Sequence, residues 1–132
     1  MMEEKKWTKI FGWVLVIIGV LGFVPGITSN GMLLGIFAVN GLHSIVHITT
    51  GALFIWAAGK DENTAKMYFK VFGIIYAAIA ILGLFGSGYV LGVLYNNIAD
   101  TILHIVIAVC ALYMGFGGKK AGTITNAPSQ TV

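Results

Sequence analysis

The chain has 132 residues, of which 58% are hydrophobic and 10% are charged; its formal net charge is +3 and its mean hydropathy is +0.90. Soluble domains contain about 45–50% apolar and about 25% charged residues, so this composition excludes an ordinary soluble domain and a disordered chain. It indicates an integral membrane protein, and at about 20 residues per membrane-spanning helix the chain holds four or at most five spans.

The first apolar run predicts a membrane span over about residues 10–27, preceded by a cytoplasmic N-terminal segment, residues 1–9. A cleaved signal peptide does not fit, because the run is longer than the usual apolar core of about 7–15 residues and no small-residue cleavage site follows it. Residues 28–40 carry no charge and are too apolar for a solvated loop. We expect this connector to lie at the membrane interface or against the bundle.

Three more spans are predicted, over about residues 40–58, 67–85 and 97–116, with a charged loop at 59–66 and a short apolar connector at 86–96. Only helices and closed barrels satisfy the backbone in lipid, and these runs are too long and too uniformly apolar for barrel strands. The fold class is therefore an all-α integral membrane protein, a four-transmembrane-helix bundle over residues 10–116. The polar tail, residues 117–132, is expected to be mobile and cytoplasmic.

The distribution of basic residues predicts the orientation of the bundle. With four spans, all eight lysines fall on one side: Lys5, Lys6, Lys9, Lys60, Lys66, Lys70, Lys119 and Lys120. The positive-inside rule places this side, with both termini, in the cytoplasm. The basic pI of 9.1 then reflects topology and contact with the lipid bilayer, and we expect no nucleic-acid partner.

The two halves of the chain resemble each other. The pattern Gly35-x4-Asn40-x2-His43-x3-His47 matches Gly92-x4-Asn97-x2-Asp100-x3-His104 at a constant offset, and Phe11-Gly12 with Leu21-Gly22 matches Phe72-Gly73 with Leu82-Gly83. We interpret the halves as two tandem two-helix repeats. Repeats with two spans each keep the same orientation, so a parallel pseudo-twofold axis along the membrane normal would relate them.

Six polar residues carry most of the chemical interest: Asn40, His43, His47, Asn97, Asp100 and His104. Their spacing of three and then four residues puts each set of three on one face of its helix. The proposed symmetry turns the two faces toward each other. Ionisable groups inside membrane spans are costly and point to a functional site by default.

Several interpretations of this cluster stay open. Asn40 and Asn97 suit helix N-caps, with Asp100 in a capping-box position, and His43 and Asp100 could pair across the bundle. His47 and His104 could form a buried polar clasp between the repeats. Alternatively, His43, His47, Asp100 and His104 suit a transition metal such as zinc, iron, copper or nickel, with the asparagines supporting the ligands. Narrower variants are a haem held by His47 and His104, and a proton relay.

The pattern resembles a known family of small four-helix membrane proteins, the domain of unknown function 4383. The resemblance rests on residues 21–26 (LGFVPG), on Phe37-x2-Asn40-x2-His43-x3-His47-x3-Gly51, on Phe72-Gly73-x2-Tyr76 and on Asn97-x2-Asp100-x2-Leu103-His104, and it covers residues 7 to 116. It implies a multi-pass protein of a prokaryotic cytoplasmic membrane. It implies no activity.

No nucleophile, phosphate-loop or dinucleotide motif is present in the sequence, and we expect no catalytic residues. The first hypothesis is a structural or accessory membrane protein whose polar cluster locks the repeats together and which assembles with itself or with a larger membrane complex. The second is a protein that binds a transition metal or haem. An ion or proton permease ranks lowest, because the inner halves of the helices offer almost no polar path.

Overall fold

The structure is a computed structural model that describes residues 2–86 and 88–117. This part of the chain forms four helices and five short strands, in the order α1 (Met2–Leu21), β1 (Thr28–Ser29), β2 (Met32–Leu33), β3 (Phe37–Ala38), α2 (Gly41–Ala58), α3 (Glu62–Phe85), β4 (Gly88–Val90), β5 (Leu94–Asn96) and α4 (Ile98–Phe116). The predicted mobile tail lies outside the described residues beyond Gly117.

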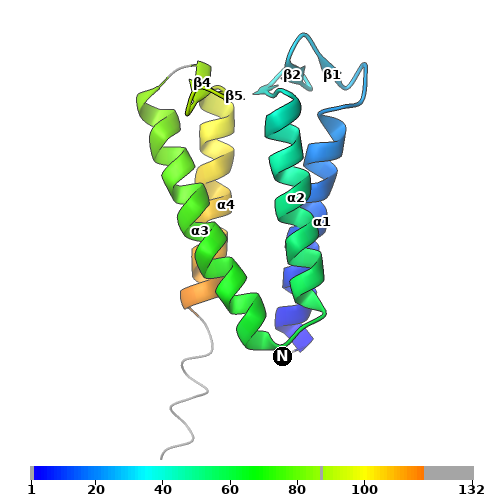
Figure 1. The fold of residues 1–132 in the computed structure, drawn as a ribbon, viewed down its shortest axis with the longest axis vertical. Helices are drawn as coiled ribbons and strands as arrows, with labels where there is room; N and C mark the ends of the chain where they lie inside the picture. The colour runs from blue at the N-terminus through cyan, green and yellow to red at the C-terminus, as the bar shows by residue number, and fades with distance from the viewer. Residues whose placement is uncertain (1, 87, 118–132) are drawn as a thin grey trace, which may run out of the picture.

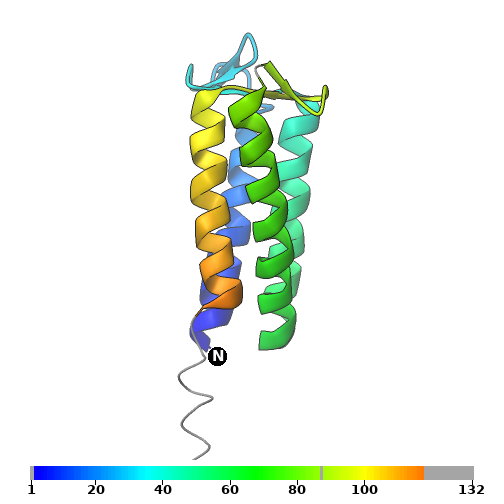
Figure 2. The same cartoon turned by 90° about the vertical axis from the view of Figure 1, so that its left-hand side faces the viewer.

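The helices form two antiparallel pairs, α1 with α2 and α3 with α4, and the strands lie together at one end of the bundle (Figures 1 and 2). Among the described residues, α2, α3 and α4 are long and apolar enough to cross a membrane. The protein is therefore mostly helical and of membrane type. Helix α1 does not meet this criterion of length and apolar composition, and its first half carries Lys5, Lys6 and Lys9.

The helix boundaries differ from the predicted spans in ways that local hydrogen bonds explain. The first helix ends at Leu21 instead of continuing to residue 27, and the following amides of Gly22 and Phe23 turn back to carbonyls three residues earlier. The third helix begins at Glu62, where Asp61 caps it by accepting a 3.0 Å hydrogen bond from the Thr64 amide. Hydrogen bonds from Thr64 also hold the pKa of the Asp61 carboxyl below its usual value.

Glycines bring the two helices of each pair into close contact. A Cβ added to Gly12 of α1 would lie 2.7 Å from the Gly51 carbonyl oxygen of α2, and one added to Gly73 of α3 would lie 2.8 Å from the side chain of Leu112 in α4. Small residues allow such an approach in lipid, where packing drives the association of helices. These glycines therefore serve contacts within each pair.

Between the two pairs lies an aromatic core. Phe54 of α2 is fully buried, and its ring centroid lies 4.9 Å from that of Phe11 and 4.8 Å from that of Phe69. Leu15 and Tyr76 extend the core toward the strands. The pairs thus join through large side chains, whereas each pair is held internally by small ones.

The prediction of an all-α fold is wrong for the two connectors, which form small antiparallel sheets, β1-β2-β3 and β4-β5. Three tight turns in these sheets place two successive residues at positive φ: Asn30 and Gly31 at 53° and 77°, Leu34 and Gly35 at 55° and 70°, and Leu91 and Gly92 at 57° and 75°. Positive φ at both central positions is typical of type I′ hairpin turns and favours glycine. Strands of two or three residues pair the backbone of apolar segments that the sequence left as loops.

The contact at Gly12 predicts the effect of adding one methyl group. We expect Gly12→Ala to lower the free energy of unfolding by about 1–3 kcal/mol, because the new Cβ meets backbone atoms that cannot move aside easily. Gly41→Ala is the control, since its Cβ would meet nothing nearer than 3.9 Å. Thermal unfolding in detergent, followed by circular dichroism, measures both, and equal stability of the two variants would contradict the packing argument.

Candidate functional site

The candidate site lies at the strand end of the bundle, where α2 and α4 begin. Asn40 is the N-cap of α2, and its Oδ1 accepts a 2.9 Å hydrogen bond from the His43 amide. Asn97 is the N-cap of α4 and accepts a 3.0 Å bond from the Asp100 amide, while Asp100 Oδ2 accepts a 2.9 Å bond from the Asn97 amide. These caps fix the first turns of both helices and thereby the side chains that follow.

Both cap residues also reach across to the other helix pair. Asn40 Nδ2 donates a 2.9 Å hydrogen bond to the Val93 carbonyl, and Asn97 Nδ2 donates a 2.9 Å bond to the Ile36 carbonyl. Val93 and Ile36 occupy corresponding places, directly after the Leu91–Gly92 and Leu34–Gly35 turns. The two bonds therefore tie the cap of each pair to the connector of the other.

A second set of contacts crosses the bundle one turn deeper. Asp100 Oδ2 accepts a 2.9 Å hydrogen bond from the Ala38 amide, and His43 Nδ1 lies 2.7 Å from the Tyr95 carbonyl oxygen. A carbonyl oxygen can only accept, so His43 Nδ1 carries the proton and donates. Both side chains thus bind backbone of the opposite connector, and neither of these hydrogen bonds joins His43 to Asp100.

Three histidines converge below these contacts. His43 and His47 of α2 and His104 of α4 are each 3% exposed. One ring nitrogen from each lies within 4.8 Å of the others. The ring centroids of His47 and His104 are 5.8 Å apart, and that of His43 is 5.1 Å from His47 and 5.5 Å from His104. Asp100 does not belong to this group, so the structure brings together three of the four residues considered as metal ligands.

The histidine cluster has ring nitrogens available for a ligand. His47 Nδ1 and His104 Nδ1 are buried and make no hydrogen bond within the described part of the chain. Because His43 Nδ1 donates to a carbonyl, its Nε2 keeps the lone pair. A histidine that donates one N–H to a backbone carbonyl and offers the other nitrogen is the usual arrangement of a metal ligand.

Two further groups lie at this site that the sequence did not predict. The Tyr76 ring of α3 lies 6.0 Å from that of His47 and 5.7 Å from that of His104, measured between centroids. Tyr76 appears in the family pattern, which was its only signal. The other missed group is the Tyr95 carbonyl, which the sequence cannot indicate because every residue has a backbone carbonyl.

Comparison with known proteins gives a family and no activity. A family model described as "Domain of unknown function (DUF4383)" matches residues 5–117. Searches of curated proteins and of solved structures returned no match. The site must therefore be interpreted from its own geometry.

Asn40 offers a way to separate its cap from its cross-pair bond. Asn40→Asp keeps an oxygen for the His43 amide and loses the amino group that binds the Val93 carbonyl, whereas Asn40→Ala loses both. We expect Asn40→Asp to lower the free energy of unfolding by about 1 kcal/mol and Asn40→Ala by about 2 kcal/mol. Chemical or thermal unfolding in detergent gives both values, and an aspartate variant as stable as the wild type would show that the cross-pair bond contributes nothing.

Proposed function

The chain belongs to the family described as Domain of unknown function (DUF4383), and because that description assigns no activity, we propose a function from the site: a small integral membrane protein that binds a transition-metal ion through His43, His47 and His104. The observation that carries the proposal is the set of three buried ring nitrogens within 4.8 Å of one another. Metal–imidazole distances of about 2.0–2.1 Å put two nitrogens on one tetrahedral ion about 3.4 Å apart, so the three rings would move slightly inward to share an ion.

The donor set favours a metal of intermediate softness. Imidazole suits zinc, copper, iron and nickel, whereas magnesium and calcium prefer oxygen ligands. Three protein ligands leave one position of a tetrahedral ion open, as in zinc sites that bind water or a small molecule. Asp100 supports the site from one turn away, because its carboxylate orders the α4 start and the β3 backbone.

An ion fits this cluster better than a haem. A porphyrin between His47 and His104 would need a plane of free space between their rings. The His43 ring lies within 5.5 Å of both, and the Tyr76 ring lies within 6.0 Å of both. These flanking rings occupy the sides through which the macrocycle would extend.

A structural role is the second candidate, and the paired asparagine bonds favour it. Asn40 and Asn97 each bind a carbonyl of the opposite connector, as a clasp between two helix pairs would. The two roles are compatible, since a metal at the histidine cluster would join the same two pairs. The unpartnered Nδ1 atoms of His47 and His104 favour the metal site over a clasp alone, because a clasp would use these nitrogens in hydrogen bonds.

We further propose that α1 also spans the membrane. It packs along α2, from Gly12 against Gly51 to Gly22, directly after the end of α1, against the Ser44 side chain. If α2 crosses the bilayer, α1 lies at the same depth. Its lysines near the start then extend toward the headgroups, as amphipathic side chains at helix ends do.

The two helix pairs are interpreted as repeats related by a parallel pseudo-twofold axis. Three kinds of feature recur at corresponding positions: the positive-φ turns at Leu34 and Leu91, the asparagine bonds to the opposite connector, and a glycine against a hydroxyl side chain. The last of these pairs Gly22 with Ser44 in one half and Gly83 with Thr101 in the other. Such agreement in geometry supports duplication of one two-helix unit.

We place the protein in the cytoplasmic membrane of a prokaryotic cell, with the strand end outside and the α2–α3 loop in the cytoplasm. The lysines support this orientation, because the strand end contains none. In a Cys110→Ala background, we expect Ser29→Cys to react with a membrane-impermeant maleimide in intact cells. Asn63→Cys should react only after the cells are permeabilised. The reverse pattern would invert the topology, and labelling of both in intact cells would contradict the four-span arrangement.

Metal binding by purified protein tests the proposed function. We expect about one equivalent of zinc per chain by elemental analysis, and cobalt substitution should give the visible absorption of a tetrahedral ion. His47→Ala and His104→Ala should each reduce binding by at least about tenfold, since each removes one ligand. Thr50→Val is the matched control, a buried polar residue one turn from His47 on α2. If the wild-type protein takes up neither metal, the metal-binding proposal is wrong and the structural clasp remains as the function.

A further inference from the structure

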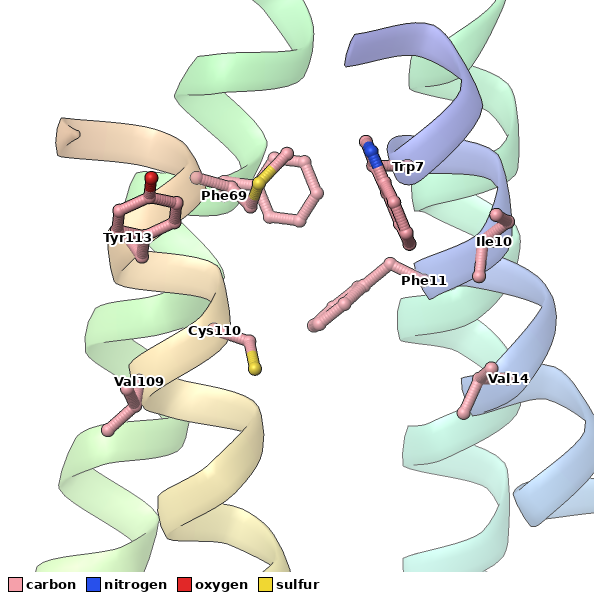
Figure 3. Close-up of a pocket in the computed structure, with 9 residues that line it drawn as sticks. Trp7, Ile10, Phe11, Val14, Phe69, Val109, Cys110 and Tyr113 are labelled. Atoms are coloured by element: carbon pink, nitrogen blue, oxygen red, sulfur yellow. The ribbon is translucent and has the colours of Figure 1, made fainter. Parts of the chain in front are cut away.

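A cavity of about 490 Å³ opens between α1, α3 and α4 at the end of the bundle opposite the histidines. Figure 3 shows Phe11 of α1 and Cys110 of α4 pointing toward each other across it; Trp7, Tyr113 and Phe69 of α3 also line it. Its walls are almost wholly apolar. The volume falls in the range of about 300–1,000 Å³ that is usual for small-molecule sites.

A basic hollow adjoins this cavity. It is lined by Lys5, Lys6 and Lys9 with Ala58 of α2, and Ile10 lines both spaces. All three lysines are exposed. In the sequence they outnumber the two acids, Glu3 and Glu4, that precede them. An apolar cavity and a cluster of ammonium groups therefore lie on either side of Ile10 on the same helix.

We propose that these two spaces together form a binding site for an anionic phospholipid. The phosphate would lie against Lys5, Lys6 and Lys9, and an acyl chain would enter the cavity beside Trp7 and Phe11. Charge complementarity selects this occupant: basic hollows at the ends of membrane helices bind anionic headgroups. The apolar walls argue against a soluble phosphate compound, because such a compound has no acyl chain to fill the cavity.

The position of the aromatic residues agrees with this ligand. Trp7 and Trp13 of α1 are about half exposed, and Tyr113 of α4 is more exposed still. Such rings favour the boundary between headgroups and acyl chains. A lipid bound here would bridge α1 and α4, the two helices that start and end the described bundle, at the end opposite the asparagine bonds.

Quenching of Trp7 fluorescence by brominated lipids tests the proposal. The protein carrying Trp13→Phe and Trp56→Phe retains one tryptophan, and it is reconstituted into phosphatidylcholine vesicles that contain a minor fraction of lipid with brominated chains. We expect brominated phosphatidylglycerol to compete for the site about fivefold better than brominated phosphatidylcholine. Replacing Lys5, Lys6 and Lys9 together by glutamine should reduce this preference to about one.

Two controls make the test specific. Replacing Lys60, Lys66 and Lys70 by glutamine removes the same charge from the same end of the bundle, and it should leave the preference unchanged. Cys110→Phe fills the cavity and should weaken quenching by both lipids. Circular dichroism confirms that each variant is folded. Equal quenching by the two lipids in the single-tryptophan protein, equal loss in both lysine variants, or burial of Trp7 in a dimer of this chain would overturn the proposal.

Discussion

The arrangement of the bundle depends on polar side chains of one helix pair binding the backbone of the other. The strand end is not helical, so its amides and carbonyls need partners near the edge of an apolar medium. Asn40, Asn97, Asp100 and His43 supply four of them, at Val93, Ile36, Ala38 and Tyr95 respectively. Because each bond joins the two pairs, satisfying the connectors also fixes how the pairs face each other. The histidines gather as a consequence of that alignment.

The two kinds of helix contact have different roles in this alignment. Glycines such as Gly12 and Gly73 let each pair form at very short range, and such contacts leave little freedom within a pair. Between the pairs, Phe11, Phe54 and Phe69 fill the space with rings, which tolerate small shifts. The polar bonds at the strand end therefore decide the relative position of the pairs, and the aromatic core accommodates it.

The sequence predicted what has a regular signal. Apolar runs gave the helices because lipid allows few alternatives, and the three-then-four spacing gave the face on which His43 and His47 lie. It could not predict the sheets, since strands of two or three residues have no alternation to detect. Nor could it separate Asp100 from the histidines, because the groups that bind this carboxylate are the amides of Asn97 and Ala38. Hydrogen bonds to backbone amides cannot be predicted from residue types, because almost every residue has such an amide.

The difference between His43 and Asp100, which occupy corresponding places in the proposed repeats, follows from the backbone that each one meets. Asp100 faces an amide and accepts from it, which a carboxylate does well. His43 faces a carbonyl, which needs a donor, and a carboxylate would repel it. An imidazole can donate from Nδ1 and still offer Nε2. The requirement for a donor at Tyr95 thus brings a third ring nitrogen to His47 and His104. A strictly symmetric pair of carboxylates would have left two histidines and no third ring nitrogen.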